Sequence, residues 1–106
     1  MENIRVVFIS LPRDEVKKFG RAVVEERLAA CVNIVPQIDS YFWWNGEVQS
    51  DQESLMILKT TEAKIDKLIK FVKENHPYDI PEIITLPVAE GLPDYVNWII
   101  DEMGKG

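Results

Sequence analysis

A tight Asn-Gly turn between two long strand-like segments limits the folds open to this chain more than any other feature. Residues 31–44 are rich in β-branched and aromatic side chains, which favour strands, and residues 47–60 end in a similar apolar run. Asn45 and Gly46 between them accept the positive φ angles that a two-residue hairpin turn requires. The sequence therefore predicts a long antiparallel ribbon, with an irregularity at Pro36 because proline cannot donate a ladder hydrogen bond.

The segments around this ribbon predict a βαββαβ order of elements. Residues 4–11 are apolar without a turn residue, and residues 82–88 have a similar character, so both are expected to be strands. Residues 16–28 and residues 62–75, which follow a capping Thr61, show the spacing of apolar side chains that is typical of helices, as do residues 93–103. This order indicates an α+β fold, a ferredoxin-like βαββαβ sandwich with an extra C-terminal helix. Right-handed connections favour the strand order 4-1-3-2.

Length and composition narrow the class of protein. We expect residues 1–106 to form a single domain, because this length suits one domain and is too short for two. The net charge of −6 argues against nucleic acid and anionic membranes as partners, since an acidic surface repels phosphate. The lone Cys31 cannot form an internal disulfide, and the N-terminus does not resemble a signal peptide, so we expect a cytoplasmic location.

The aromatic end of the ribbon predicts an oligomer. A strand of about 14 residues reaches roughly 45 Å, whereas helices of about 15 residues span only ~22 Å, so part of the ribbon must overhang them. The overhang carries Tyr41, Phe42, Trp43 and Trp44, which would form an exposed apolar patch in a single chain. We expect these four residues to lie in a homo-oligomer interface. The alternative is that the ribbon bends at Pro36 and the aromatics fold back over the chain's own sheet, where the last helix could cover them.

His76 and Cys31 are the candidate metal ligands. A neutral imidazole binds copper or zinc, and a thiol is a soft ligand. His76 is the only histidine, however, and at a helix C-terminus it equally well orders the loop that follows. Cys31 lies between apolar neighbours, where a free cysteine usually packs as a small hydrophobic side chain. For both residues, packing is the alternative to metal binding.

Lys59, Tyr78 and Glu82 are the candidate residues of a ligand-binding cleft. They supply an amine, a phenol and a carboxylate, and we expect them near one end of the sheet, where they could bind a small polar ligand. The alternative is that Tyr78 packs while Lys59 and Glu82 form an ion pair across strands.

Several groups of residues, collinear over nearly the whole chain, form a specific pattern. They are residues 26–34 (ERLAACVNI), Tyr41 and Trp43 ahead of Gly46, residues 59–61 (KTT), residues 76–83 (HPYDIPEI), and Tyr95 with Trp98. This pattern resembles the CutA family. The resemblance implies a homotrimer whose hairpins exchange edges between subunits, similar in architecture to the PII signal proteins. It also implies a link to tolerance of divalent cations and to copper binding.

The resemblance also implies ligand positions that this chain fills differently. Some family members carry a cysteine on the first strand, where this chain has Ile9, and a pair of histidines where it has Asn75 and His76. The expected function is that of a non-enzymatic homotrimer in divalent metal tolerance, with copper as the candidate ion and no cofactor required. The alternative is a PII-like signalling or scaffold trimer that binds a small ligand or protein. An enzyme with His76 as general base would lack a second activated group.

Overall fold

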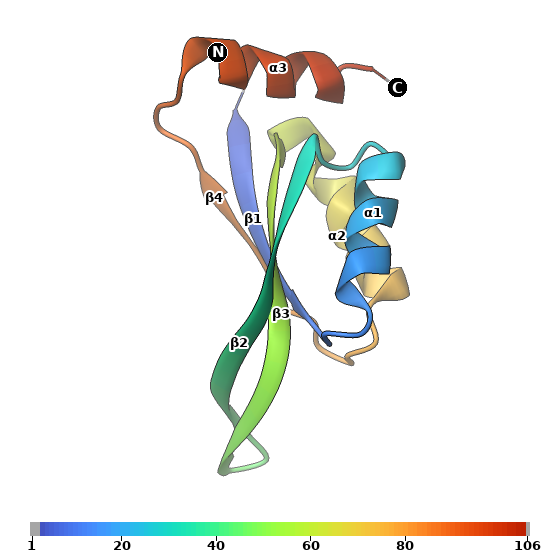
Figure 1. Cartoon of the computed structure of the whole chain (residues 1–106), viewed down its shortest axis with the longest axis vertical. Coiled ribbons are helices and arrows are strands. Elements are labelled where there is room, and N and C mark those ends of the chain that lie inside the picture. Colours follow the sequence, from blue (N-terminus) through green and yellow to red (C-terminus); the bar gives the residue numbers. More distant parts are fainter. Residues whose placement is uncertain (1–2, 106) are drawn as a thin grey trace.

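The structure, a computed structural model, describes residues 3–105. They form an α+β fold with a four-stranded antiparallel sheet and three α-helices (Figure 1). The elements in chain order are β1 (Ile4–Leu11), α1 (Val16–Glu25), β2 (Cys31–Trp44), β3 (Glu47–Thr61), a 3₁₀ turn (Glu62–Lys64), α2 (Ile65–Asn75), β4 (Ile83–Pro87) and α3 (Pro93–Met103). The strand order β2-β3-β1-β4 confirms the predicted order. Within residues 3–105, no helix is long and apolar enough to cross a membrane.

α1 and α2 cover one face of the sheet and enclose the main core. Every second residue of β1 is buried against them, and each helix contributes apolar side chains at helical spacing. The fully buried members are Val7, Ile9, Leu11, Val23, Met56, Leu58, Leu68 and Val72. This packing fixes the orientation of β1 and α2, and therefore of the loops at their ends.

Two local features of α1 follow from its sequence. Gly20 lies where a Cβ would be 3.3 Å from the Met56 sulfur and 3.3 Å from a methyl group of Val32, so a larger residue would press on these two side chains where the helix meets the sheet. The helix ends at Glu25, earlier than the sequence predicts, because Arg27 adopts a φ of 57° and reverses the chain.

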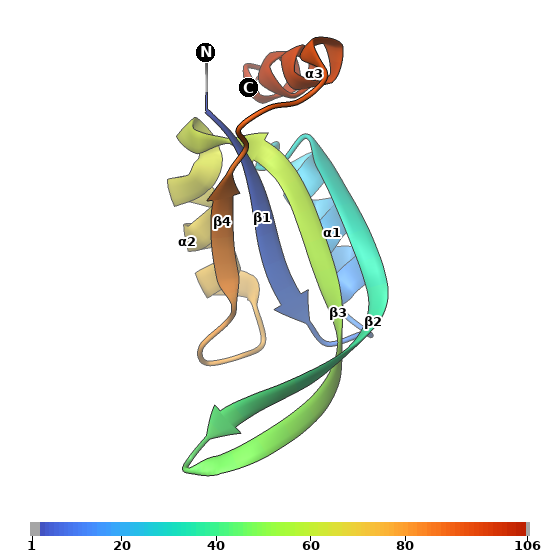
Figure 2. The ribbon, with the colours of Figure 1, turned by 90° about the vertical axis from the view of Figure 1, so that its left-hand side faces the viewer.

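The hairpin beyond the bulge, residues 38–53, projects past both helices, and we refer to it as the arm (Figures 1 and 2). Its turn residues Asn45 and Gly46 have φ angles of 51° and 77°, as predicted for this hairpin. The strand register shifts between Val35 and Ile38, which confirms the irregularity at Pro36. The arm gives the chain its long axis, 44 Å against 25 and 23 Å.

The aromatic side chains of the arm are exposed in the single chain. Tyr41 is 75% and Trp43 is 74% exposed, and Phe42 and Trp44 are exposed by 42% and 47%. α3 packs at the opposite end of the sheet, against Ile4, and so cannot cover them (Figure 1). The alternative in which the ribbon folds back beneath the last helix is therefore wrong.

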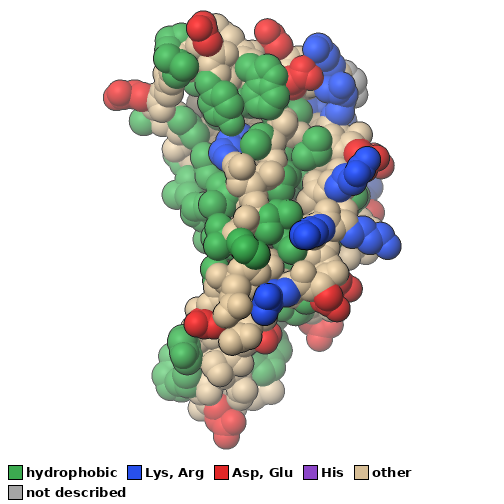
Figure 3. Space-filling view, in the orientation of Figure 1, with side chains coloured by type: hydrophobic (Ala, Val, Ile, Leu, Met, Phe, Trp, Pro, Cys, Tyr) green, Lys and Arg blue, Asp and Glu red, His purple; other side chains and the backbone are tan. Residues whose placement is uncertain are grey.

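Among residues 3–105, no helix covers the face of the sheet that looks away from α1 and α2, and we refer to it as the open face (Figure 2). The strand register places on it apolar side chains from four strands, namely Val6, Phe8, Val35, Leu55, Ile57, Ile84 and Leu86. Ile84 is 56% and Leu86 is 45% exposed. Hydrophobic side chains gather along the sheet side in Figure 3, whereas Lys and Arg side chains cluster over the helices. The open face is thus an apolar surface without an intrachain cover.

Candidate functional site

His76 is buried at the end of α2, where it ties three segments together. Its Nε2 lies 2.7 Å from the carbonyl oxygen of Ser10, and its Nδ1 lies 3.1 Å from the backbone nitrogen of Tyr78. Because a carbonyl only accepts hydrogen bonds, Nε2 carries the proton and donates it, while Nδ1 accepts from the Tyr78 N–H. The ring also packs against Phe19 and Tyr78, at centroid distances of 6.0 and 4.8 Å. Neither nitrogen keeps a free lone pair for a metal ion.

The other candidate metal-ligand positions do not form a metal site with His76 either. Cys31 is at the start of β2, far along the sheet from His76, so the structure does not bring the two together. Ile9 is fully buried in the core, and the Asn75 side chain donates to the carbonyl oxygen of Phe71 at 2.8 Å. Within residues 3–105, no three His, Cys, Asp or Glu side chains gather closely enough to hold a metal ion.

Lys59 lies in a polar group on the open face that we refer to as the Lys59 cluster: Cys31, Asn33, Lys59 and Tyr95. The Asn33 Oδ1 accepts a hydrogen bond from the Lys59 ammonium and a weaker one, at 3.6 Å, from the Cys31 thiol. Burial raises the pKa of Tyr95, as does the neighbouring Cys31. In the part of the chain that the structure describes, Lys59 forms no ion pair. The cluster therefore presents a half-buried cation on an apolar surface.

Lys59 is separated from the other two candidate cleft residues. It pairs with Val6 across β1 and β3, whereas Tyr78 and Glu82 border a cavity beside Ser10. Those two positions on β1 are roughly 13 Å apart, at about 3.3 Å per strand residue. Our prediction that the three residues meet at one end of the sheet is wrong within a single chain, and so is the Lys59–Glu82 ion pair. The reason is that β3 and β4 both run antiparallel to β1 and therefore in the same direction as each other. Lys59 lies near the end of β3 and Glu82 lies just before the start of β4, so the two residues are at opposite ends of the sheet.

The half-buried Tyr78 and the buried Glu53 form a hydrogen-bonded pair that the sequence did not predict. The Tyr78 hydroxyl donates to the Glu53 Oε1 at 2.9 Å, and Glu53 is only 6% exposed. Burial, the hydrogen bond to Glu53 and the charges of Glu53 and Asp51 raise the pKa of Tyr78 far above its ordinary value. The signal in the sequence was weak, because residues 47–54 look like a solvated polar strand.

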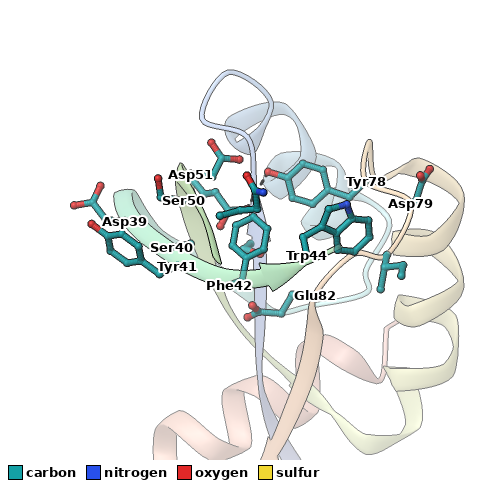
Figure 4. A pocket seen from close by; sticks show the side chains of 14 residues that line it. Asp39, Ser40, Tyr41, Phe42, Trp44, Ser50, Asp51, Tyr78, Asp79 and Glu82 are labelled. Carbon is teal, nitrogen blue, oxygen red and sulfur yellow. Dashed lines mark hydrogen bonds between the residues drawn. The ribbon is translucent and has the colours of Figure 1, made fainter. Parts of the chain in front are cut away.

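The pair borders a cavity of about 890 Å³ between the arm and the loop of residues 78–82 (Figure 4). We refer to it as the acidic cavity. The arm, the end of β1 and the loop form its walls. It is lined by five carboxylate side chains, Asp39, Asp51, Glu53, Asp79 and Glu82, and by the aromatic side chains of Tyr41, Phe42, Trp44 and Tyr78. Of the predicted cleft residues, Tyr78 and Glu82 belong to this cavity and Lys59 does not.

A protein-family model and a solved structure both match this chain over most of its length. Residues 5–102 match the family model described as CutA1 divalent ion tolerance protein. The chain belongs to the CutA1 family. The crystal structure of CutA1 from Oryza sativa superimposes with a TM-score of 0.94 at 42% identity, covering 99% of this chain and 97% of that one.

CutA relatives from distant organisms are identical to this chain at about half of the aligned positions. The divalent-cation tolerance protein CutA of Thermus thermophilus is 50% identical over 100 residues, which cover 93% of this chain and 97% of that protein. The chloroplastic CutA 1 of Oryza sativa is 47% identical over 95 residues, which cover 89% of this chain and 54% of that protein. The chain thus spans about half the length of the rice protein and nearly all of the Thermus one. Membership of the CutA1 family confirms the resemblance found in the sequence motifs.

Proposed function

We propose that this CutA1 family member works as a non-enzymatic homotrimer in tolerance of divalent cations, copper among them. In this proposal the fold is of the ferredoxin-like type and the trimer resembles that of the PII proteins. The observation that carries it is the uncovered apolar surface, made of the open face and the aromatic side chains of the arm. The names of the relatives link the family to divalent-cation tolerance.

The uncovered surface is large enough to drive assembly. An aromatic side chain buries roughly 150–250 Å² when fully covered, which is worth about 4–6 kcal/mol at ~25 cal/mol per Å² before entropy is counted. Trp43 and Tyr41 are each about three-quarters exposed, and Ile84 and Leu86 add further apolar area. A closed ring of copies would cover both surfaces without leaving a free strand edge on the arm.

We further propose that the tolerance function does not run through a His76–copper bond. Both imidazole nitrogens are engaged, Nε2 by the Ser10 carbonyl and Nδ1 by the Tyr78 N–H. A copper ion would have to break one of these bonds and unpack a ring that is 8% exposed. Any copper contact is then expected to be weak and to lie on surface carboxylates.

Native mass spectrometry of chelator-stripped protein, with one equivalent of copper(II) per chain, tests this proposal. We expect a trimer with a broad, weak distribution of copper adducts, unchanged in His76→Ala. Electron paramagnetic resonance of the wild type gives a second readout, because imidazole coordination produces nitrogen hyperfine splitting. A defined copper count that His76→Ala abolishes, together with that splitting, would show direct binding and overturn the proposal.

The second candidate function is a trimer that binds a small anionic ligand, and the Lys59 cluster favours it. Lys59 is half-buried on an apolar face. Its ammonium donates a hydrogen bond to Asn33 but pairs with no carboxylate in the described chain. Such a cation gains from pairing with a carboxylate or phosphate ligand. Thermal shift screening of small carboxylates and nucleotides should find a stabiliser that Lys59→Met abolishes. Lys105→Met, which removes an exposed ammonium elsewhere, is the matched control; equal loss in both variants would exclude the site.

A further inference from the structure

Met103, the last residue of α3, borders a cavity at the surface of the molecule. The cavity has a volume of about 230 Å³ and lies between the ends of α1 and α3, and we refer to it as the Met103 cavity. Met103 is 6% exposed, whereas Met56, the other methionine within residues 3–105, is 0% exposed in the main core. A molecule the size of hydrogen peroxide fits such a cavity. The Met103 side chain can therefore be reached from solvent without unfolding of the main core.

The walls of the Met103 cavity lie outside the surface that we assign to the trimer. They come from the end of α1, from the turn that leads to β2 and from one side of α3, with Val24, Arg27, Ala29 and Trp98 among the lining residues. In the described part of the chain, neither the arm nor the open face contributes to this lining. We therefore expect the Met103 side chain to stay accessible in the assembly.

A single hydroxyl proton lies between the Met103 sulfur and a backbone carbonyl. The hydroxyl oxygen of the fully buried Thr60 is 2.8 Å from the Leu28 carbonyl oxygen and 3.3 Å from the sulfur. A hydroxyl donates one proton and a thioether is only a weak acceptor, so the carbonyl takes the proton at little cost to the sulfur. A sulfoxide oxygen is a stronger acceptor, and beside Thr60 it would leave either itself or the carbonyl without a donor. Oxidation would therefore create an unpaired buried acceptor, which is costly.

α3 is packed on the end of the sheet through a core much smaller than the one under α1 and α2 (Figure 1). Its buried members are Ile4, Val96, Ile99 and Met103. A methionine that becomes a sulfoxide changes from a flexible apolar side chain into a polar one, and a polar group without a partner is expensive in an apolar core. Because Met103 is one of only four buried members, the change would weaken the attachment of the last turn of α3.

We propose that Met103 is a site of oxidation by hydrogen peroxide, and that its sulfoxide loosens the last turn of α3 from the sheet. In this step a sulfur lone pair attacks one peroxide oxygen and the O–O bond breaks. The proton on the transferred oxygen passes to the leaving hydroxide, so methionine sulfoxide and one water molecule form. The sulfur is oxidised by two electrons and the peroxide is reduced. The step uses no metal ion and no residue of the Lys59 cluster, so the proposal is independent of the functions proposed above.

Hydrogen peroxide treatment of the full chain in its native assembly, followed by trypsin cleavage and tandem mass spectrometry, tests the proposal. We expect Met103 to gain one oxygen at least about tenfold faster than Met56, whose sulfur is reached only when the main core opens. The oxidised protein should unfold about 5 °C below the untreated protein, and amide hydrogen exchange should rise at the end of α3. Met103→Leu, which keeps a similar side-chain volume, is the matched control, and peroxide should leave its thermal midpoint unchanged.

Three results would overturn this assignment. Oxidation of Met103 no faster than that of Met56 would show that the cavity gives no access to the sulfur. An equal fall of the midpoint in Met103→Leu would assign the effect to another side chain, and an oxidised protein as stable as the untreated one would exclude the loosening of α3. Methionine sulfoxide reductases provide a second measurement on the wild type, in case the variant does not fold. Removal of the added oxygen should restore the midpoint, and a midpoint that stays low would refute the proposal.

Discussion

Replacing Tyr78 by phenylalanine removes the only hydrogen bond that the Glu53 carboxylate receives within the described chain. The Glu53 side chain is 6% exposed and accepts the Tyr78 hydroxyl at 2.9 Å. A hydrogen bond to a charged group contributes about 1.5–3 kcal/mol, and the buried acceptor that it leaves behind costs energy of the same order. We therefore expect Tyr78→Phe to lower the free energy of unfolding by about 2 kcal/mol per chain.

The assay is urea unfolding followed by circular dichroism at several protein concentrations. Global fitting across concentrations is needed because assembly contributes to the stability of an oligomer. Glu53→Gln should cost less, since the amide oxygen still accepts the phenol while the buried charge is gone. The double variant should then show a coupling energy of about 1 kcal/mol or more between the two positions.

Glu90→Gln is the control, because the Glu90 side chain is exposed, forms no hydrogen bond or ion pair within residues 3–105 and lies outside the surface assigned to the trimer. It should change the free energy of unfolding by roughly 0.5 kcal/mol or less. If Tyr78→Phe cost no more than this control, or if the double-mutant cycle showed no coupling, the reasoning that the buried carboxylate depends on the phenol would be refuted.

Two further predictions concern ionisation and the hairpin turn. The pKa of Tyr78 is raised in the folded chain, so its contribution to stability is complete below the unfolded value of 10.0 and is lost as pH rises through the higher folded value. The stability difference between wild type and Tyr78→Phe should thus shrink above pH 10; a constant difference would contradict the raised pKa. Gly46→Ala should lower the free energy of unfolding in urea by about 1 kcal/mol, because the φ of Gly46 is 77° and an alanine is strained at that angle. No neighbouring atom would contact the added Cβ, so the backbone strain is the only cost. Gly104→Ala, at a φ of −77°, is the control and should be near neutral; equal effects would show that the turn geometry is not the cause.

The order of strands and helices could be predicted because it depends on local signals. The Asn45-Gly46 turn, the proline at position 36 and the apolar spacing of the helices each act within a few residues. Arg27 shows the limit of such signals: it takes a positive φ that its residue type does not favour, and α1 ends two residues before it, at Glu25.

The candidate site was less accessible to sequence reasoning because its contacts join distant segments. The ring of His76 bonds to a carbonyl 66 residues away, and Tyr78 pairs with a glutamate 25 residues away. Neither pairing has a sequence signature, since both depend on how the strands align. The homotrimer, the cytoplasmic location and a role in copper tolerance stay predictions.

The central claim is that the open face and the aromatic side chains of the arm close a homotrimer, and native mass spectrometry tests it most directly. The account predicts a single species at three times the chain mass of 12.2 kDa at micromolar concentration. Trp43→Glu, which places a charge on a side chain that is 74% exposed in the single chain, should shift the population towards monomer. A wild-type protein that stays monomeric and folded at that concentration would contradict the account.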